Sequence, residues 1–322
     1  MLLIKQVMLL CSRAALCFVL LLLPLSSYAQ IEITDSHGKY RFAKPPERVV
    51  VLNWALAEQM IELGEVPLGV ADVEGYRRHA GHAALPDSVL DVGERLSPSL
   101  SEIKALKPEI IVIGYSQRSL LRPLSNIAKV IYFKNFGKRY NNQEKSRDRF
   151  LELAKLFDKT EFAENKLKER EARLGILRQR LQDAYVDNSP PAVQFIVPDV
   201  SNAAKSGASL VFGANSMPFY AAQALGLTVL APQESDQFGM SQLTSAQLDE
   251  LVSGYEGDLC QFNLLSYSQG VTSEKGKESE ENPESGGHCV GVMDYQNSFG
   301  GIMSILYLAE SIVDGLLGGQ QL

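Results

Sequence analysis

Histidine, cysteine and tryptophan are scarce in this chain of 322 residues, which contains four, four and one of them. Zinc sites in proteins are built from clustered histidine, cysteine and carboxylate ligands at short spacing. His79 and His82 stand close together, but no cluster of acidic residues or further histidines at metal-site spacing accompanies them. The sequence therefore predicts no metal site built from the protein's own side chains.

Two of the four cysteines, Cys11 and Cys17, lie in the amino-terminal segment described below, so that Cys260 and Cys289 remain in the body of the chain. Two cysteines do not make a disulfide framework. They could pair in an oxidising compartment. We favour the alternative, in which Cys260 is a buried thiol at the end of an apolar stretch and Cys289 is a separate thiol on a loop.

Motifs of the common enzyme classes are also absent. The sequence contains no Gly-rich phosphate loop, no nucleophile elbow and no metallohydrolase motif. Ser206 and Ser209 with His288 do not form a convincing Ser/His/Asp set. These absences favour a binding protein over an enzyme.

Long apolar runs are confined to the first 29 residues. Lys5 and Arg13 lie ahead of or beside an apolar run at 14–25, and small residues up to Ala29 offer a cleavage site. The run is short for a bilayer span, which is the alternative reading. We therefore predict a signal peptide at residues 1–29, its removal, and export to the periplasm.

The chain has no excess of positive charge. Its formal net charge is −7, and the loss of Lys5 and Arg13 with the signal peptide lowers it to −9, from 29 basic and 38 acidic residues. An acidic protein binds nucleic acid poorly, because phosphate contacts depend on lysine and arginine. We expect no nucleic-acid partner.

Short apolar runs alternate with helical patterns along the first part of the mature chain. Residues 48–52 and 109–114 are typical of strands buried on both faces, and residues 55–63 and 99–106 carry apolar side chains at helical spacing. The order strand–helix–strand predicts a parallel sheet. We assign residues 30–140 to a first α/β lobe.

Residues 141–187 are almost free of glycine and proline and predict a linking helical segment. Its part from 160 to 185 alone would span about 40 Å at 1.5 Å per residue, which is the width of a lobe. Strand and helix patterns then resume, and we assign residues 188–322 to a second α/β lobe. Within it, residues 266–287 are polar and read as an exposed loop or a disordered insert. The expected fold is α/β, with two lobes joined by one long helix in a clamshell of limited hinge motion.

Four groups of short motifs lie between residues 45 and 260: RVVVLNW at 48–54, LPDSV and DVGER within 85–95, PSL and LKP within 98–108, and LVFGANS at 210–216. In these motifs the chain resembles the periplasmic ferric-hydroxamate siderophore-binding proteins, which belong to the single-helix-linked class of importer binding proteins. Residues 261–297 depart from the family pattern of a helix, a strand and an aromatic-rich loop. Divergence or a change of reading frame would account for this departure.

The resemblance implies a ligand in the cleft between the lobes. By position, Arg95 matches the arginine that bonds the oxygens of the iron-bound hydroxamates, and Tyr115 matches the tyrosine that assists it. Four more residues are expected at the walls or rim of the cleft: Trp54, Phe238, Phe299 and His79. Taken singly, each of these residues could instead serve packing or lie on the surface.

The expected chemistry agrees with this reading. Iron(III) prefers oxygen ligands, and the siderophore supplies them, so that the protein needs no cofactor and holds iron only through the ligand. A guanidinium fork suits the outer face of anionic oxygens better than an ammonium group does. The resemblance implies a monomer that delivers its ligand to an inner-membrane ABC permease and its ATPase.

Two alternatives remain open. The same architecture could bind haem, a corrinoid, or a catecholate or citrate complex of iron. The last two would be favoured if several arginines of the first lobe converge on the cleft: Arg77, Arg78, Arg118 and Arg122. A periplasmic enzyme that releases iron from a siderophore is the second alternative.

Overall fold

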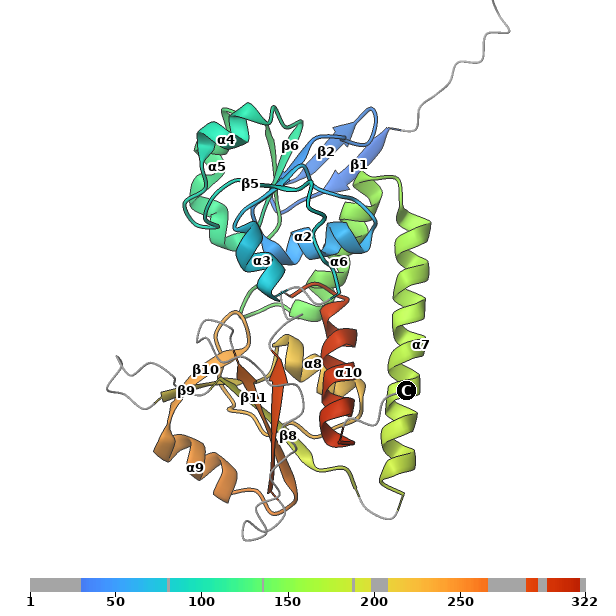
Figure 1. Ribbon diagram of the computed structural model, residues 1–322, viewed down its shortest axis with the longest axis vertical. Helices are drawn as coiled ribbons and strands as arrows, with labels where there is room; N and C mark the ends of the chain where they lie inside the picture. The colour runs from blue at the N-terminus through green and yellow to red at the C-terminus, as the bar shows by residue number, and fades with distance from the viewer. Residues whose placement is uncertain are drawn as a thin grey trace, which may run out of the picture.

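The computed structural model describes residues 30–79, 82–134, 136–186, 189–197, 208–265, 288–294 and 300–318. Two α/β lobes lie one above the other in Figure 1, and the long helix α7 (Thr160–Ala184) runs beside both. The expected fold class is therefore confirmed. The predicted signal peptide at 1–29 and the polar stretch at 266–287 lie outside the described residues.

The first lobe is built on a sheet of five parallel strands in the order β5-β4-β3-β6-β7. The strands are β3 (Val49–Val51), β4 (Gly69–Val70), β5 (Leu90–Asp91), β6 (Ile110–Ile113) and β7 (Lys129–Tyr132). All residues of β3 and β6 are buried, as expected for central strands of a parallel sheet covered on both faces.

Helices cover both faces of this sheet (Figure 1). They are α2 (Trp54–Glu62), α3 (Val73–His79), α4 (Leu100–Ala105), the 3-10 helix η1 (Tyr115–Leu120) and α5 (Leu121–Ser125). Because successive strand residues point to opposite faces, Val51 and Val112 join one core cluster, and Val50 and Ile111 join the other. The cap of α2 is Asn53, whose side chain accepts a hydrogen bond from the Leu56 amide at 3.3 Å.

An antiparallel hairpin precedes the sheet. It consists of β1 (Ile31–Thr34) and β2 (Lys39–Phe42), paired from Ile31 opposite Phe42 to Thr34 opposite Lys39. Helix α6 (Asn142–Leu156) packs against β1 and α2, and thus belongs to the body of the first lobe.

The linking segment forms two helices, because the chain turns between α6 and α7. Asp158 adopts a left-handed conformation with φ 55°, which ends α6. Helix α7 contains 25 residues and rises about 37 Å at 1.5 Å per residue. Its buried face carries Leu167, Leu174, Leu177 and Leu181 at helical spacing.

The second lobe has a mixed sheet in the order β10-β9-β8-β11-β12. Its strands are β8 (Ala192–Val197), β9 (Ala208–Phe212), β10 (Met240–Thr244), β11 (Leu259–Leu265) and β12 (His288–Asp294). The strands β8, β11 and β12 are parallel, whereas β9 is antiparallel to both of its neighbours. The helices are α8 (Met217–Ala224), α9 (Ser245–Ser253) and α10 (Ser304–Leu316). No helix in the described part of the chain is long and apolar enough to span a membrane.

Cys260 and Cys289 form a disulfide, contrary to the expectation of two separate thiols. They are register partners on the adjacent strands β11 and β12, and their Cα atoms lie 4.5 Å apart. The expectation failed because residues 288–294 show no strand pattern in the sequence. These residues form β12 by pairing along the whole length of β11.

Candidate functional site

The carboxyl edge of the first sheet collects the residues singled out by the sequence. Trp54 begins α2, three residues past the end of β3, Arg95 lies in the loop after β5, and Tyr115 follows β6. The strands β3 and β6 are neighbours, but the chain leaves β3 towards β4 on the opposite side. Ligands of open α/β sheets bind at such a switch point, in the crevice outside the carboxyl ends of the strands.

Arg95 lies over the ring of Trp54, with its Cζ atom 3.8 Å from the ring centroid. Trp54 is only 8% exposed. Its Nε1 donates a hydrogen bond to the Ala71 carbonyl at 2.9 Å, and its ring meets Tyr76 edge to face. Trp54 is therefore a buried platform beneath Arg95, and little of its surface is left to contact a ligand.

The guanidinium of Arg95 stays charged in this position. Burial lowers its pKa, and the nearby Asp72 carboxylate acts in the opposite direction. Arginine starts from so high a pKa that it remains protonated. Stacking on Trp54 restricts the orientation of the guanidinium plane, while the residue as a whole remains exposed.

Gln117 connects the two loops that carry Arg95 and Tyr115. Its side chain is buried; Nε2 donates to the Arg95 carbonyl at 3.2 Å, and Oε1 accepts from the Gly114 amide at 3.2 Å. Gln117 carries no signal in the sequence, because a single glutamine two residues after Tyr115 resembles any polar loop residue. It holds the two proposed ligand-binding residues in a constant relative position.

Tyr115 is 36% exposed and lies beside a lysine that the sequence analysis did not identify. The Nζ atom of Lys134 is 5.9 Å from the Tyr115 ring centroid and 5.0 Å from that of Tyr140. Lys134 is the second residue after β7, and β7 is the neighbour of β6. Neither Lys134 nor Tyr140 carries a local motif, so only the strand order brings them to Tyr115.

The second lobe contributes Phe238 to the same region. Its ring centroid lies 5.2 Å from that of Phe136, in the segment that leaves the first lobe. Asp236 shapes the turn, since its Oδ1 accepts hydrogen bonds from the amides of Phe238 and Met240 at 2.8 and 2.9 Å. Phe238 is half-buried, so part of its ring is accessible.

A cavity of about 400 Å³ lies where the segment after β7 meets the second lobe. It is lined by Lys138, Tyr140, Ala214, Asn215, Gln233, Glu234 and Ser235. Residues that follow β7 and residues of the second lobe thus line one open cavity, and Tyr140 of this lining lies beside Lys134.

Asn142, at the start of α6, joins the linking segment to the second lobe. Its backbone amide donates to Asn215 Oδ1 at 2.8 Å, and its Nδ2 donates to the carbonyls of Asn215 and Gln237, both at 2.9 Å. Its Oδ1 accepts from the Gly137 amide at 3.1 Å. The side chain is fully buried and hydrogen-bonded at both ends, so the segment after β7 is held firmly against the second lobe.

Two carboxylates of α2 lie between the lobes. Glu58 is 2% exposed, accepts a hydrogen bond from Ser304 Oγ at 2.7 Å and also accepts from the backbone amides of Gly301 and Ser304. Burial raises the pKa of Glu58 to about 8 against the opposing effect of these hydrogen bonds, and the charge of Glu62 adds to the rise. Its Oε2 has no hydrogen-bond partner among the described residues.

Glu62, one turn later, is compensated by two donors. It accepts hydrogen bonds from Lys166 of α7 and from the Tyr307 hydroxyl of α10. Burial raises the pKa of Tyr307, which therefore remains a donor. The ring of His82 stacks on Tyr307 with centroids 3.9 Å apart. The described residues include no group of three or more His, Cys, Asp or Glu arranged to hold a metal ion.

Two of the predicted residues lie wholly or partly outside the described part of the chain. His79 is the last residue of α3, but the structure does not describe its side chain. Phe299 lies outside the described residues. The other four predicted residues, Arg95, Trp54, Tyr115 and Phe238, all lie on elements that border the space between the lobes.

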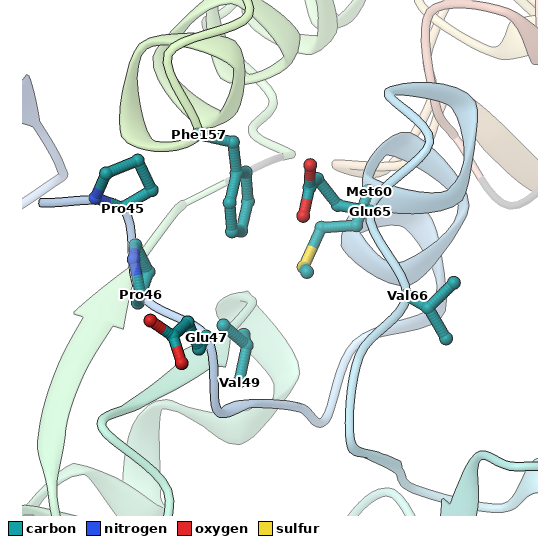
Figure 2. A pocket seen from close by; sticks show the side chains of 8 residues that line it. All are labelled: Pro45, Pro46, Glu47, Val49, Met60, Glu65, Val66 and Phe157. Atoms are coloured by element: carbon teal, nitrogen blue, oxygen red, sulfur yellow. The ribbon is translucent and has the colours of Figure 1, made fainter.

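A second cavity, of about 320 Å³, lies at the opposite end of the first sheet. It is lined by Pro45, Pro46, Glu47, Val49, Met60, Glu65, Val66 and Phe157. Figure 2 shows Phe157 and Met60 pointing into it. Val49 begins β3, whereas Trp54 follows its end, so this cavity is separate from the region around Arg95.

Most of this chain is similar to known proteins. A family model described as periplasmic binding protein matches residues 49–257. The chain is 33% identical to the siderophore-binding protein FhuD from Vibrio cholerae, solved with Fe³⁺-Desferal bound, over 84% of this chain and 98% of that one, with a TM-score of 0.71.

Two curated proteins of Escherichia coli (strain K12) match shorter segments. The iron(3+)-hydroxamate-binding protein FhuD is 33% identical over 135 residues, which cover 42% of this chain and 45% of the relative. The Fe(3+) dicitrate-binding periplasmic protein FecB is 32% identical over 130 residues, which cover 38% and 42%. These matches span less than half the length of either curated relative.

Proposed function

Because this chain belongs to the periplasmic binding protein family, we propose that it is the exported binding protein of an ABC importer and that it captures an iron(III) complex of a hydroxamate siderophore. It would work in the periplasm after removal of residues 1–29, as a monomer, and would pass its ligand to an inner-membrane permease with its ATPase. It would bind and release its ligand without catalysing a reaction.

The stacking of Arg95 on Trp54, in a loop that Gln117 ties to the segment of Tyr115, is the observation that carries this proposal. A ferric hydroxamate presents a face of anionic oxygens around the metal. A stacked guanidinium at the same sheet edge as a phenol suits that face, and the iron would touch no protein atom. The likeness to a solved chain whose name includes Fe³⁺-Desferal supports the hydroxamate class.

A citrate complex of iron is the second candidate, because a dicitrate-binding protein is among the relatives. Such a ligand carries more negative charge than a ferric trihydroxamate. The two candidates therefore differ in how many cationic groups the cleft must supply.

Tryptophan fluorescence tests the proposal directly, since Trp54 is the sole tryptophan and lies beneath Arg95. Titration of the mature protein with ferric desferrioxamine should quench its emission with saturation at micromolar concentration. Iron-free desferrioxamine and ferric citrate serve as comparison ligands. Saturable quenching by ferric citrate alone would favour the second candidate. The absence of quenching by any ferric siderophore would reject the function.

A further inference from the structure

The carboxyl edge of the first sheet carries a second cation besides Arg95. Lys134 lies two residues past β7, and β7 and β3 flank β6 on opposite sides. Arg95 reaches back over Trp54, just past β3. The guanidinium of Arg95 thus lies over the residue that follows β3, and Lys134 follows β7, so the two cations belong to the strands that flank β6, which Tyr115 follows.

Two aromatic rings hold the ammonium group of Lys134 without neutralising it. Its Nζ atom lies 5.0 Å from the ring centroid of Tyr140 and 5.9 Å from that of Tyr115. These distances are within the range of cation–π attraction, which orients a cation and leaves its charge in place. No carboxylate of the described residues lies within ion-pair distance of Lys134.

The surroundings bring this charge next to Tyr140, a residue that lines the cavity at the second lobe. The Lys134 backbone amide donates to Ser36 Oγ at 2.7 Å, which fixes the start of the segment, and Tyr140 lines the 400 Å³ cavity together with Lys138. Glu234 is the acidic residue of that lining and belongs to the second-lobe wall. The first-lobe side of the cavity is thus cationic.

Resting on the proposed function, we propose that Lys134 selects ferric hydroxamates that carry a free carboxylate away from the iron centre. Three hydroxamates neutralise iron(III), so Arg95 and Tyr115 need meet only the oxygens around the metal of a neutral complex. The ammonium group of Lys134 is then available to bind a carboxylate of the ligand that is not bound to iron. An ammonium is a compact point charge without a fixed fork, which suits a carboxylate at the end of a flexible arm.

Three ligands with the same iron centre separate this preference from binding of the metal complex. They are the iron(III) complexes of desferrioxamine B, of its N-acetyl derivative and of its N-succinyl derivative, whose free ends are cationic, neutral and anionic. Titration calorimetry of the mature wild-type protein with each ligand should give the order succinyl, acetyl, amine from tightest to weakest. We expect at least a fivefold difference between the succinyl and acetyl complexes, diminished at high salt.

Lys134→Gln should bring the succinyl and acetyl complexes to within twofold of each other and leave affinity for the acetyl complex unchanged. Lys129→Gln is the matched control, because Lys129 begins the same strand and also lies over two rings, those of Phe42 and Tyr40, at the opposite end of the sheet. This variant should retain the wild-type preference.

Three results would overturn the proposal. Equal affinities of the wild-type protein for the succinyl and acetyl complexes would show that no preference exists. An equal loss for all three ligands in Lys134→Gln would mean that Lys134 serves the iron centre. A preference that persists in Lys134→Gln would place the selecting group elsewhere. Failure of all three ferric complexes to bind the wild-type protein would instead reject the proposed function, and this inference with it.

Discussion

Ser304 in the first turn of α10 donates a hydrogen bond of 2.7 Å to Glu58 of α2, and these two helices belong to different lobes. The backbone amides of Gly301 and Ser304 donate to the same carboxylate. A carboxylate of the first lobe thus accepts hydrogen bonds from residues at the start of a second-lobe helix. Glu58 therefore helps to fix the angle between the lobes.

This contact predicts that stability falls as pH rises. Burial raises the pKa of Glu58 to about 8 in the folded protein, from 4.5 for an unperturbed group, so between these values the folded state binds more protons than the unfolded state. The contribution of this group is fully present below about pH 4.5 and is lost as pH approaches 8. Glu58→Gln, which stays neutral, should raise the melting temperature at pH 8 and flatten its decline from pH 5 to 8. Thermal unfolding followed by circular dichroism measures both.

Glu62→Gln is the control for this prediction and should have the opposite effect. Glu62 accepts from Lys166 and Tyr307, so removal of its charge leaves Lys166 without its anion. The variant should unfold at a lower temperature than the wild type at pH 8. If Glu58→Gln instead lowered the melting temperature at pH 8, burial of the charged Glu58 carboxylate would not be destabilising, which contradicts this prediction.

We expect a large loss of stability when the side-chain amide of Asn142 is removed. Asn142→Ala removes two donated hydrogen bonds and one accepted one from a fully buried position and leaves the carbonyls of Asn215 and Gln237 unpaired. We expect a loss of about 2–4 kcal/mol in the free energy of unfolding, measured by urea denaturation. Asn126→Ala changes an exposed asparagine and should cost less than about 0.5 kcal/mol. Equal effects of the two substitutions would show that the hydrogen bonds of the Asn142 side chain do not stabilise the fold.

The bridge between Cys260 and Cys289 predicts that the mature protein has no free thiol. Under non-reducing denaturing conditions it should not react with a maleimide, and after reduction it should take up two labels. With a sequence separation of 29 residues, the chain-entropy model gives a stabilisation of about 3–4 kcal/mol. A double serine variant should lose a comparable amount in urea denaturation. Maleimide labelling without reduction would contradict the bridge.

Among the site residues, we expect the substitution of Arg95 to cause the largest loss of ligand affinity. Arg95→Ala should weaken binding of ferric desferrioxamine at least tenfold, or about 1.4 kcal/mol, because it removes the guanidinium that faces the hydroxamate oxygens. Calorimetry is the proper measurement here, since the substitution also uncovers Trp54 and changes its fluorescence. Arg122→Ala, on the exposed side of α5, should bind as the wild type does. Unchanged affinity in Arg95→Ala would mean that the ligand binds elsewhere.

Much of the fold could be predicted because its signals are local. The runs at 48–52 and 109–114 are apolar throughout, as central parallel strands are, and the structure buries β3 and β6 completely. The segment at 160–185 has helical composition without breakers and forms α7. The strand β12 could not be predicted, because its residues are strand-forming only when paired with β11.

Part of the candidate site could be predicted, because some of its residues also have local signals in the sequence. Arg95 ends the DVGER motif and Tyr115 directly follows the apolar run at 109–114, so their place at the carboxyl edge could be expected. Trp54 was expected at a cleft wall, but the loop after β5 folds Arg95 over it. Lys134 and Tyr140 carry no motif, and only the adjacency of β6 and β7 brings them to Tyr115.

The sequence by itself determined the α/β composition, the two lobes with their linking helix and the residues that end the strands of the first sheet, since these depend on patterns within about 10 to 25 neighbouring residues. The tertiary structure alone decided which of those residues meet. Glu58 and Ser304 are 246 positions apart, and no local pattern distinguishes a buried inter-lobe carboxylate from a solvated one on an amphipathic helix. Burial, charge compensation and cation–π contact depend on partners that are remote in the chain, and so only the assembled lobes reveal them.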